Sequence, residues 1–166
     1  MMRWLVAGLG LLAAACASAA PQPGGTSRAA GGLIDRYDEA ALKRVIADLR
    51  YKVVDTDVSS TGKPFMSVEA VGGVAFRIMG ESCEGEGKDQ VCLGIQLSTQ
   101  FGDSAADLDN IIAQGNRTLR PAKLFRVDAG MAYERYLIMD GGISAENLST
   151  NISVFVEVMQ LLLERL

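Results

Sequence analysis

The chain has 166 residues, 49% of them hydrophobic and 22% charged, and its formal net charge is −4. This length and composition predict one globular domain and exclude wholesale disorder, and the weak acidity without a basic run argues against nucleic acid as the main partner. The chain contains no histidine, which excludes Ser-His and Cys-His nucleophile pairs and histidine-ligated zinc.

Residues 1–19 have the layout of a cleaved secretory signal peptide. Arg3 precedes an apolar run over residues 4–15, and the A-x-A pattern of residues 17–19 predicts cleavage after Ala19. The run is shorter than the ~20 apolar residues of a transmembrane helix, so we expect no membrane span. A signal of this kind predicts a periplasmic or secreted protein of a bacterial envelope.

Cys16 leaves a second interpretation of the same segment open. It follows three alanines, which resembles a bacterial lipoprotein signal, although such signals usually carry Leu, Val or Ile where this chain has Ala13. Residues 20–32 are rich in Pro, Gly and Ser and are expected to be a flexible linker. If Cys16 is lipidated, this linker tethers the domain to a membrane; otherwise it is a loose N-terminus.

Residues 33–166 are expected to form a single domain that opens with a helix. This helix begins at Asp35 or Tyr37 and ends near Leu49, because apolar residues recur there at helical spacing. Alternating and β-branched residues then predict strands over residues 51–58, 65–71 and 74–79. Turns are predicted at residues 61–64 and 72–73.

Cys83 and Cys92 are predicted to form a structural disulfide. They flank the polar sequence EGEGKDQV, which suits the turn of a hairpin. The eight intervening residues match neither a thioredoxin motif nor a zinc site, which argues against a redox or metal role. The following strand, residues 91–101, is expected to bury one face and to expose the other, which carries Cys92, Gly94, Gln96 and Ser98.

The second half of the domain repeats the alternation of helix and strands. A helix is predicted from Asp103 or Ser104 to about Leu119, with Pro121 ending it. Strands over residues 122–128 and 131–139 follow, and Ser144 is expected to cap a last helix that runs to the end of the chain. Because the connections between successive strands are too short for parallel crossovers, we expect an α+β domain: a mostly antiparallel sheet of about six strands and three helices, in the order α-ββββ-α-ββ-α.

The last helix carries more apolar residues than one buried face requires. One stripe is predicted to lie in the core and consists of Leu148, Ile152, Phe155, Met159, Leu162 and Leu166. Val154, Val158 and Leu161 form a second stripe on another side of the helix. We expect this second stripe to meet a partner or a second copy of the chain, or else to be covered by the first helix or the N-terminal arm.

Catalytic and metal-binding patterns are absent from the sequence. Asp103, Asp107 and Asp109 stand where acidic residues complement a helix dipole. The acidic residues around the cysteine hairpin, Glu81, Glu84, Glu86 and Asp89, lack the spacing of an EF-hand and are expected to be solvated. A hydrolase that uses carboxylates alone would need paired acids in a cleft, which no pattern indicates. We therefore expect no catalytic residue, no metal and no cofactor.

Several short segments together suggest a family. They are the Gly62-Lys63-Pro64 turn, the Cys83 and Cys92-Leu93 pair, the strand ending in Phe101, the Asn110 to Asn116 helix, the Leu124-Phe125-Arg126-Val127-Asp128 strand and the Gly141-Gly142-Ile143-Ser144 turn. In order and spacing, residues 36–165 resemble an exported member of the YbjN-domain family, whose members are also described as bacterial sensory transduction regulators. The chain departs from relatives that carry Trp-Asn and Arg-Phe where it has Gly115-Asn116 and Arg120-Pro121.

This resemblance implies a fold like that of type III secretion chaperones, which are small, acidic, non-enzymatic and usually dimeric and which bind extended segments of a partner. The sequence therefore predicts an exported, non-enzymatic binding domain, chaperone-like or regulatory, with a protein partner or a second copy held through the sheet, an exposed strand edge and the second stripe of the last helix. The alternative is an envelope lipoprotein anchored through Cys16, with a structural or scaffolding role.

Overall fold

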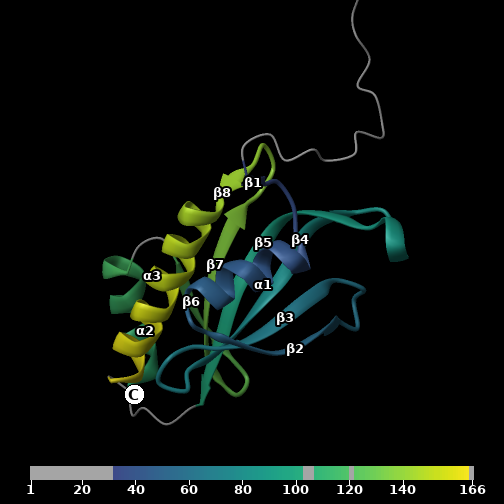
Figure 1. Ribbon diagram of the computed structural model, residues 1–166. Helices are drawn as coiled ribbons and strands as arrows, with labels where there is room; N and C mark the ends of the chain where they lie inside the picture. Colours follow the sequence, from purple (N-terminus) through teal and green to yellow (C-terminus); the bar gives the residue numbers. More distant parts are fainter. Residues whose placement is uncertain (1–31, 103–106, 120–121, 165–166) are drawn as a thin grey trace, which may run out of the picture.

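The computed structural model describes residues 32–102, 107–119 and 122–164 and confirms an α+β fold (Figure 1). Within these residues, six strands form one antiparallel sheet in the order β2-β3-β4-β5-β7-β6. The elements are β1 (Leu33–Ile34), α1 (Glu39–Asp48), β2 (Lys52–Val58), β3 (Pro64–Glu69), β4 (Ala75–Glu84), a 3-10 helix (Gly87–Asp89), β5 (Val91–Gly102), α2 (Leu108–Thr118), β6 (Lys123–Val127), β7 (Gly130–Ile138), β8 (Ile143–Ser144) and α3 (Ala145–Leu163).

Within the described residues, each of the three α-helices begins with a side-chain cap. The Asp38 carboxylate accepts a hydrogen bond from Ala41 N at 3.0 Å at the start of α1. Ser144 Oγ accepts from Asn147 N at 3.1 Å, which confirms the predicted cap of α3. The Asp107 carboxylate accepts a hydrogen bond from Asn110 N and caps α2, which is described from Leu108. The predicted start at residues 103–104 and the predicted stop at Pro121 lie outside the described residues.

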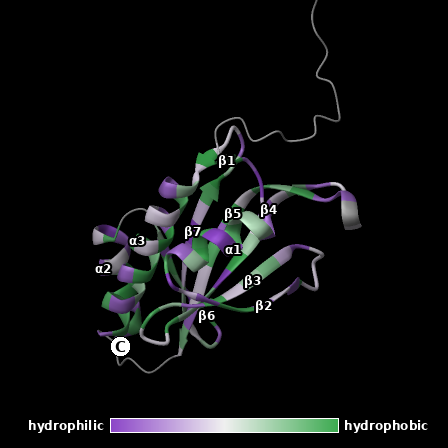
Figure 2. Cartoon of the chain, in the orientation of Figure 1, coloured by the Kyte–Doolittle hydropathy of each residue, from purple (hydrophilic) through white to green (hydrophobic). Residues whose placement is uncertain are grey.

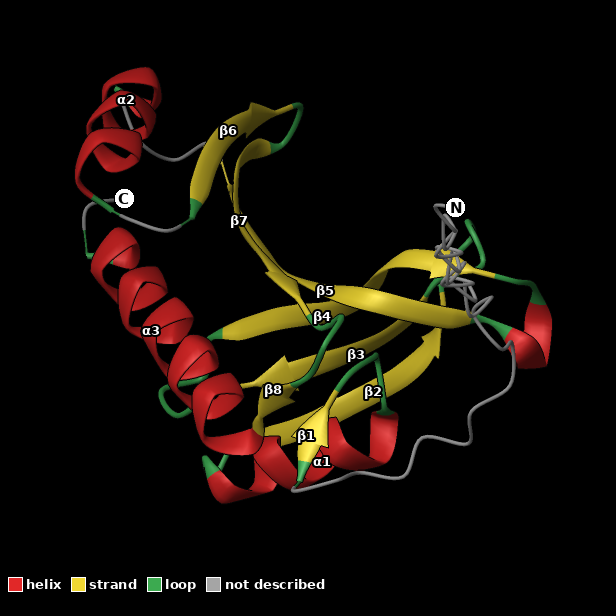
Figure 3. Cartoon of the chain, turned by 90° about the horizontal axis from the view of Figure 1, so that it is seen from above, coloured by secondary structure: helices red, strands yellow, loops and turns green. Residues whose placement is uncertain are grey.

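The core lies between one face of the sheet and the helices α1 and α3 (Figure 3). Alternate residues of the strands reach it, because successive side chains of a strand point to opposite faces. The predicted core stripe of α3 is fully buried from Leu148 to Leu162, whereas Leu166 lies outside the described residues. Phe155 of this stripe stacks on Tyr133 of β7 with 4.5 Å between ring centroids. Figure 2 shows the resulting mixture of hydrophobic and hydrophilic residues along α1 and α3.

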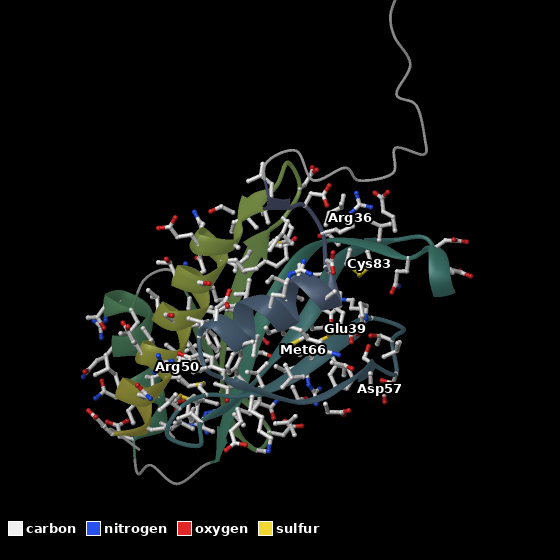
Figure 4. All side chains as sticks on the ribbon, in the orientation of Figure 1. Arg36, Glu39, Arg50, Asp57, Met66 and Cys83 are labelled. Atoms are coloured by element: carbon white, nitrogen blue, oxygen red, sulfur yellow. A yellow bond between two sulfur atoms is a disulfide. The ribbon has the colours of Figure 1, made fainter. Side chains whose placement is uncertain are left out.

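The β4–β5 hairpin carries the predicted disulfide, with 2.07 Å between the sulfur atoms of Cys83 and Cys92. Figure 4 labels Cys83 in the part of the hairpin that extends beyond the neighbouring strands. Strand β4 continues to Glu84, because its register with β5 holds as far as the pair Glu84 and Val91.

One prediction for β5 is wrong at the disulfide end of the strand. Cys92 and Gly94 were expected on the solvent face, but both are buried. The disulfide covers Cys92, and the Tyr136 ring lies over Gly94 so closely that a Cβ atom there would clash with its hydroxyl. Further along the strand, Gln96 and Ser98 are partly exposed as expected.

Candidate functional site

The strand register builds a polar row across the face of the sheet that α1 and α3 leave open. Cross-strand pairs join Ser67 of β3 to Arg77 of β4, Arg77 to Ser98 of β5, and Ser98 to Glu134 of β7. Asp55 of β2 pairs with Ser67 at one end of the row, and Lys123 of β6 pairs with Glu134 at the other. These six residues lie opposite the core because their strand neighbours Val68, Phe76, Ile78, Leu97 and Tyr133 are buried.

A groove of about 510 Å³ follows this row and spans strands β2, β3, β4, β5 and β7. Its lining combines small side chains, such as Ser67, Ser98 and Ala132, with longer polar ones. The complete lining is Val54, Ser67, Val68, Ala75, Phe76, Arg77, Met79, Gln96, Ser98, Thr99, Gln100, Ala132 and Glu134. Seven of these thirteen residues are polar or charged, so the groove suits a polar ligand.

Arg77 is an exposed cation in this groove. Its guanidinium carbon lies 4.4 Å from the centroid of the Phe65 ring, a cation–π contact that orients the side chain. Among the described residues, no carboxylate forms an ion pair with Arg77. The hydrogen-bond donors at the edge of its guanidinium group are therefore available to a ligand.

Glu134 lines the same groove, and unlike Arg77 it is partly buried and has charged and hydrogen-bonding neighbours. Burial raises the pKa of its carboxyl group above the ordinary value, a hydrogen bond from Gln96 and the charge of Lys123 lower it, and the charge of Glu81 raises it further. The Lys63 ammonium lies 2.5 Å from the Glu81 carboxylate and so compensates that charge. The groove therefore has an uncompensated cation on β4 and a partly desolvated acid on β7.

The hydroxyl groups of Ser82 and Tyr136 form a hydrogen bond near the disulfide end of the sheet. Tyr136 of β7 reaches across Gly94 of β5, and its hydroxyl lies 2.9 Å from Ser82 Oγ of β4. Ser82 has φ of 50°, a left-handed conformation that is unusual for a residue with a side chain. Glycine at position 94 is needed for this crossing, because a larger residue would displace the Tyr136 ring.

The two outer strands are modified in ways that oppose addition of another strand. At β6, the Asn116 carboxamide bonds to both backbone groups of Leu124. At β2, the register shifts between Val53 and Asp55, and the Asp57 carboxylate accepts from Val58 N at 2.7 Å. Bulges and charged side chains are common protections of sheet edges. The open face therefore suits a ligand better than these outer edges, where an added strand was expected.

The residues predicted to bind a partner through α3 lie in the helical layer, away from the groove. Val154 and Val158 are half-buried, and Val158 packs against the core. Leu161 is 48% exposed. Part of the second stripe thus packs against the core. Contact of this stripe with a partner stays a prediction. Cys16 lies outside the described residues.

Two of the acidic residues predicted near the start of α2 have structural contacts. Asp107 caps α2, and the Asp109 carboxylate accepts from Arg126 Nε at 3.0 Å, whereas Asp103 lies outside the described residues. In the described part of the chain, no three acidic or cysteine side chains gather as a metal site would require. No helix of that part is both long and apolar enough to cross a membrane.

Sequence reasoning did not identify the groove. Its only local signal is a polar residue at alternate positions of predicted strands, such as Arg77, Gln96 and Glu134. Such alternation is also what any half-exposed strand shows. Searches of protein-family models, of curated proteins and of solved structures find no match to this chain.

Proposed function

We propose that this protein is an exported, non-enzymatic binding domain, chaperone-like or regulatory, that holds an extended segment of a partner protein on the open face of its sheet. The observation that carries the proposal is the groove of about 510 Å³, lined by five strands on the face opposite α1 and α3. Convergent amide, hydroxyl and charged side chains between apolar ones suit recognition of a polar chain.

Two observations support export. The signal-peptide pattern of residues 1–19 directs a chain out of the cytoplasm, and a structural disulfide between Cys83 and Cys92 persists best in an oxidising compartment. The resemblance to the YbjN-domain family agrees with a binding role, since the related chaperone-like folds hold extended segments without catalysis.

A second candidate function is that of an envelope lipoprotein with a structural or scaffolding role. The observation that favours it is the sequence Ala13-Ala14-Ala15-Cys16, which resembles a lipidation signal. A Cys16→Ser variant tests it by membrane fractionation. Loss of the protein from the membrane fraction supports the anchor, and unchanged soluble export rejects it.

The proposed function is tested by co-purification from an envelope extract after mild crosslinking, using the full chain with a C-terminal tag. Ser98→Trp adds a bulky side chain to the lining of the groove, and Thr150→Trp adds the same side chain at an exposed position of α3. We expect wild type and Thr150→Trp to recover one partner at a near equimolar ratio and Ser98→Trp to lose it. Recovery of only a self-linked dimer, or equal recovery by both variants, contradicts the proposal. Thermal unfolding of each variant checks that it folds.

A further inference from the structure

The charge pattern of the groove indicates which partner segment it fits. The Arg77 guanidinium is held over Phe65 and has no carboxylate partner among the described residues. The pairs Arg77–Ser98 and Ser98–Glu134 keep the cation and the acid two strand spacings apart, roughly 10 Å between their backbones. The Arg77 guanidinium lies over Phe65 of β3, on the side away from β5 and β7, and forms no ion pair with Glu134.

The side chains beside Arg77 match the groups of a peptide backbone. Gln96 and Gln100 line the groove, and their carboxamides carry donors and an acceptor, as a peptide unit does. Gln96 uses one donor on Glu134 and keeps its second N–H and its oxygen for a ligand. Met79 and Val54 add apolar surface at the side, and methionine adapts to varied side chains.

An acidic sugar fits the same surface less well. Sugar rings are commonly held against an open aromatic face, but the Phe65 ring is covered by the Arg77 guanidinium group. The aromatic residue in the groove lining, Phe76, is only 4% exposed. The charge of Arg77 and the amide side chains thus favour a peptide over a glycan.

We infer that the partner segment is an extended peptide with an acidic side chain, whose carboxylate pairs with Arg77 while its backbone bonds to Gln96 and Gln100. This inference rests on the proposed function and specifies the ligand of the same groove. A carboxylate receives a guanidinium group through two parallel hydrogen bonds, which gives arginine its preference for acids.

The inference is tested by nuclear magnetic resonance on the ¹⁵N-labelled protein. Two blocked hexapeptides serve as probes, acetyl-AAEVAA-amide and its glutamine counterpart acetyl-AAQVAA-amide. We expect the glutamate peptide to shift amide signals of β4, β5 and β7 and to bind about fivefold more tightly, the effect of one exposed charge-assisted pair.

Two variants that each remove one positive charge separate the effect of Arg77 from general electrostatics. Arg77→Gln is expected to equalise the two affinities, whereas Arg44→Gln, on the exposed side of α1, is expected to preserve the difference. A dispersed spectrum shows that each variant is folded. Equal affinities in the wild type, or a difference that survives in Arg77→Gln, overturn the inference.

The remaining outcomes distinguish this inference from the proposed function. If both peptides shift the groove signals equally, the acidic specificity fails and the binding role stands. If neither peptide shifts them, the inference fails, and co-purification with Ser98→Trp judges the proposed function separately. Tighter binding of an oligogalacturonate than of the glutamate peptide would overturn the choice of a peptide.

Discussion

The carboxamide of Asn116 on α2 binds Leu124 on β6 as a neighbouring strand would. Asn116 Nδ2 donates to Leu124 O at 2.8 Å, and Leu124 N donates to Asn116 Oδ1 at 2.8 Å. Gly115 permits this approach, since a Cβ atom there would lie 2.7 Å from Leu124 Cδ1. One side chain thus satisfies both backbone groups of an edge residue and attaches α2 to the sheet.

Asn116→Ala should therefore destabilise the domain and uncover the edge of β6. We expect the free energy of unfolding in urea to fall by about 1–3 kcal/mol, since two backbone groups lose their partners. Asn110→Ala is a matched control on the same helix, because the Asn110 side chain only accepts from Gln114 at an exposed position. Equal stability of the two variants would contradict this role of Asn116.

The Cys83–Cys92 disulfide should stabilise the β4–β5 hairpin. Replacing both cysteines with serine is expected to lower the free energy of unfolding by about 2–3 kcal/mol, the value for closing a short loop. Reduction of the wild type should have the same effect, measured by denaturant unfolding with and without dithiothreitol. A variant as stable as the oxidised wild type would contradict a stabilising role.

Two tyrosines, the buried Tyr133 and the partly buried Tyr37, should make the fold sensitive to alkali. Burial raises the pKa of Tyr37 to about 12 and that of Tyr133 to about 12, whereas an unfolded tyrosine ionises near pH 10. Between these values the unfolded state releases its protons first, so the free energy of unfolding falls as the pH rises.

The double variant Tyr37→Phe/Tyr133→Phe should show a smaller loss of stability between about pH 9 and pH 11 than the wild type, measured by denaturant unfolding. Tyr37→Phe alone is expected to keep or raise stability at pH 7, because the Tyr37 hydroxyl is buried without a hydrogen-bond partner. Identical pH profiles of wild type and double variant would refute the assignment.

Two residues of the second stripe of α3 differ in burial: Val158 packs against the core, and Leu161 is exposed. Val158→Glu places a charge against the core and should cost about 1–3 kcal/mol, whereas Leu161→Glu at an exposed position should cost less than about 0.5 kcal/mol. If the stripe mediates association, Leu161→Glu weakens it while the monomer stays folded, as measured by light scattering. Unchanged association in Leu161→Glu would remove this residue from any interface.

Local patterns predicted the helices and most strands because each depends on the period of its own segment. The two-residue strands β1 and β8 escaped prediction, since Leu33 and Ser144 pair across more than a hundred residues and show no local period. The groove escaped for the same reason: the row of Arg77, Ser98 and Glu134 is created by register between strands. Pairing between residues far apart in the sequence thus determines the positions of β1, β8 and the groove, and local patterns carry no signal for it.

Site-specific photo-crosslinking in living cells tests most directly whether the open face holds a partner segment. A photoreactive amino acid is placed at Gln100, which lines the groove, or at Glu146, which is exposed at the start of α3. If the open face holds a partner segment, position 100 gives a discrete adduct with one protein that is lost when Ser98→Trp is added, and position 146 gives no such adduct. The same adduct from both positions, or one from position 100 that survives Ser98→Trp, would contradict binding of a segment there.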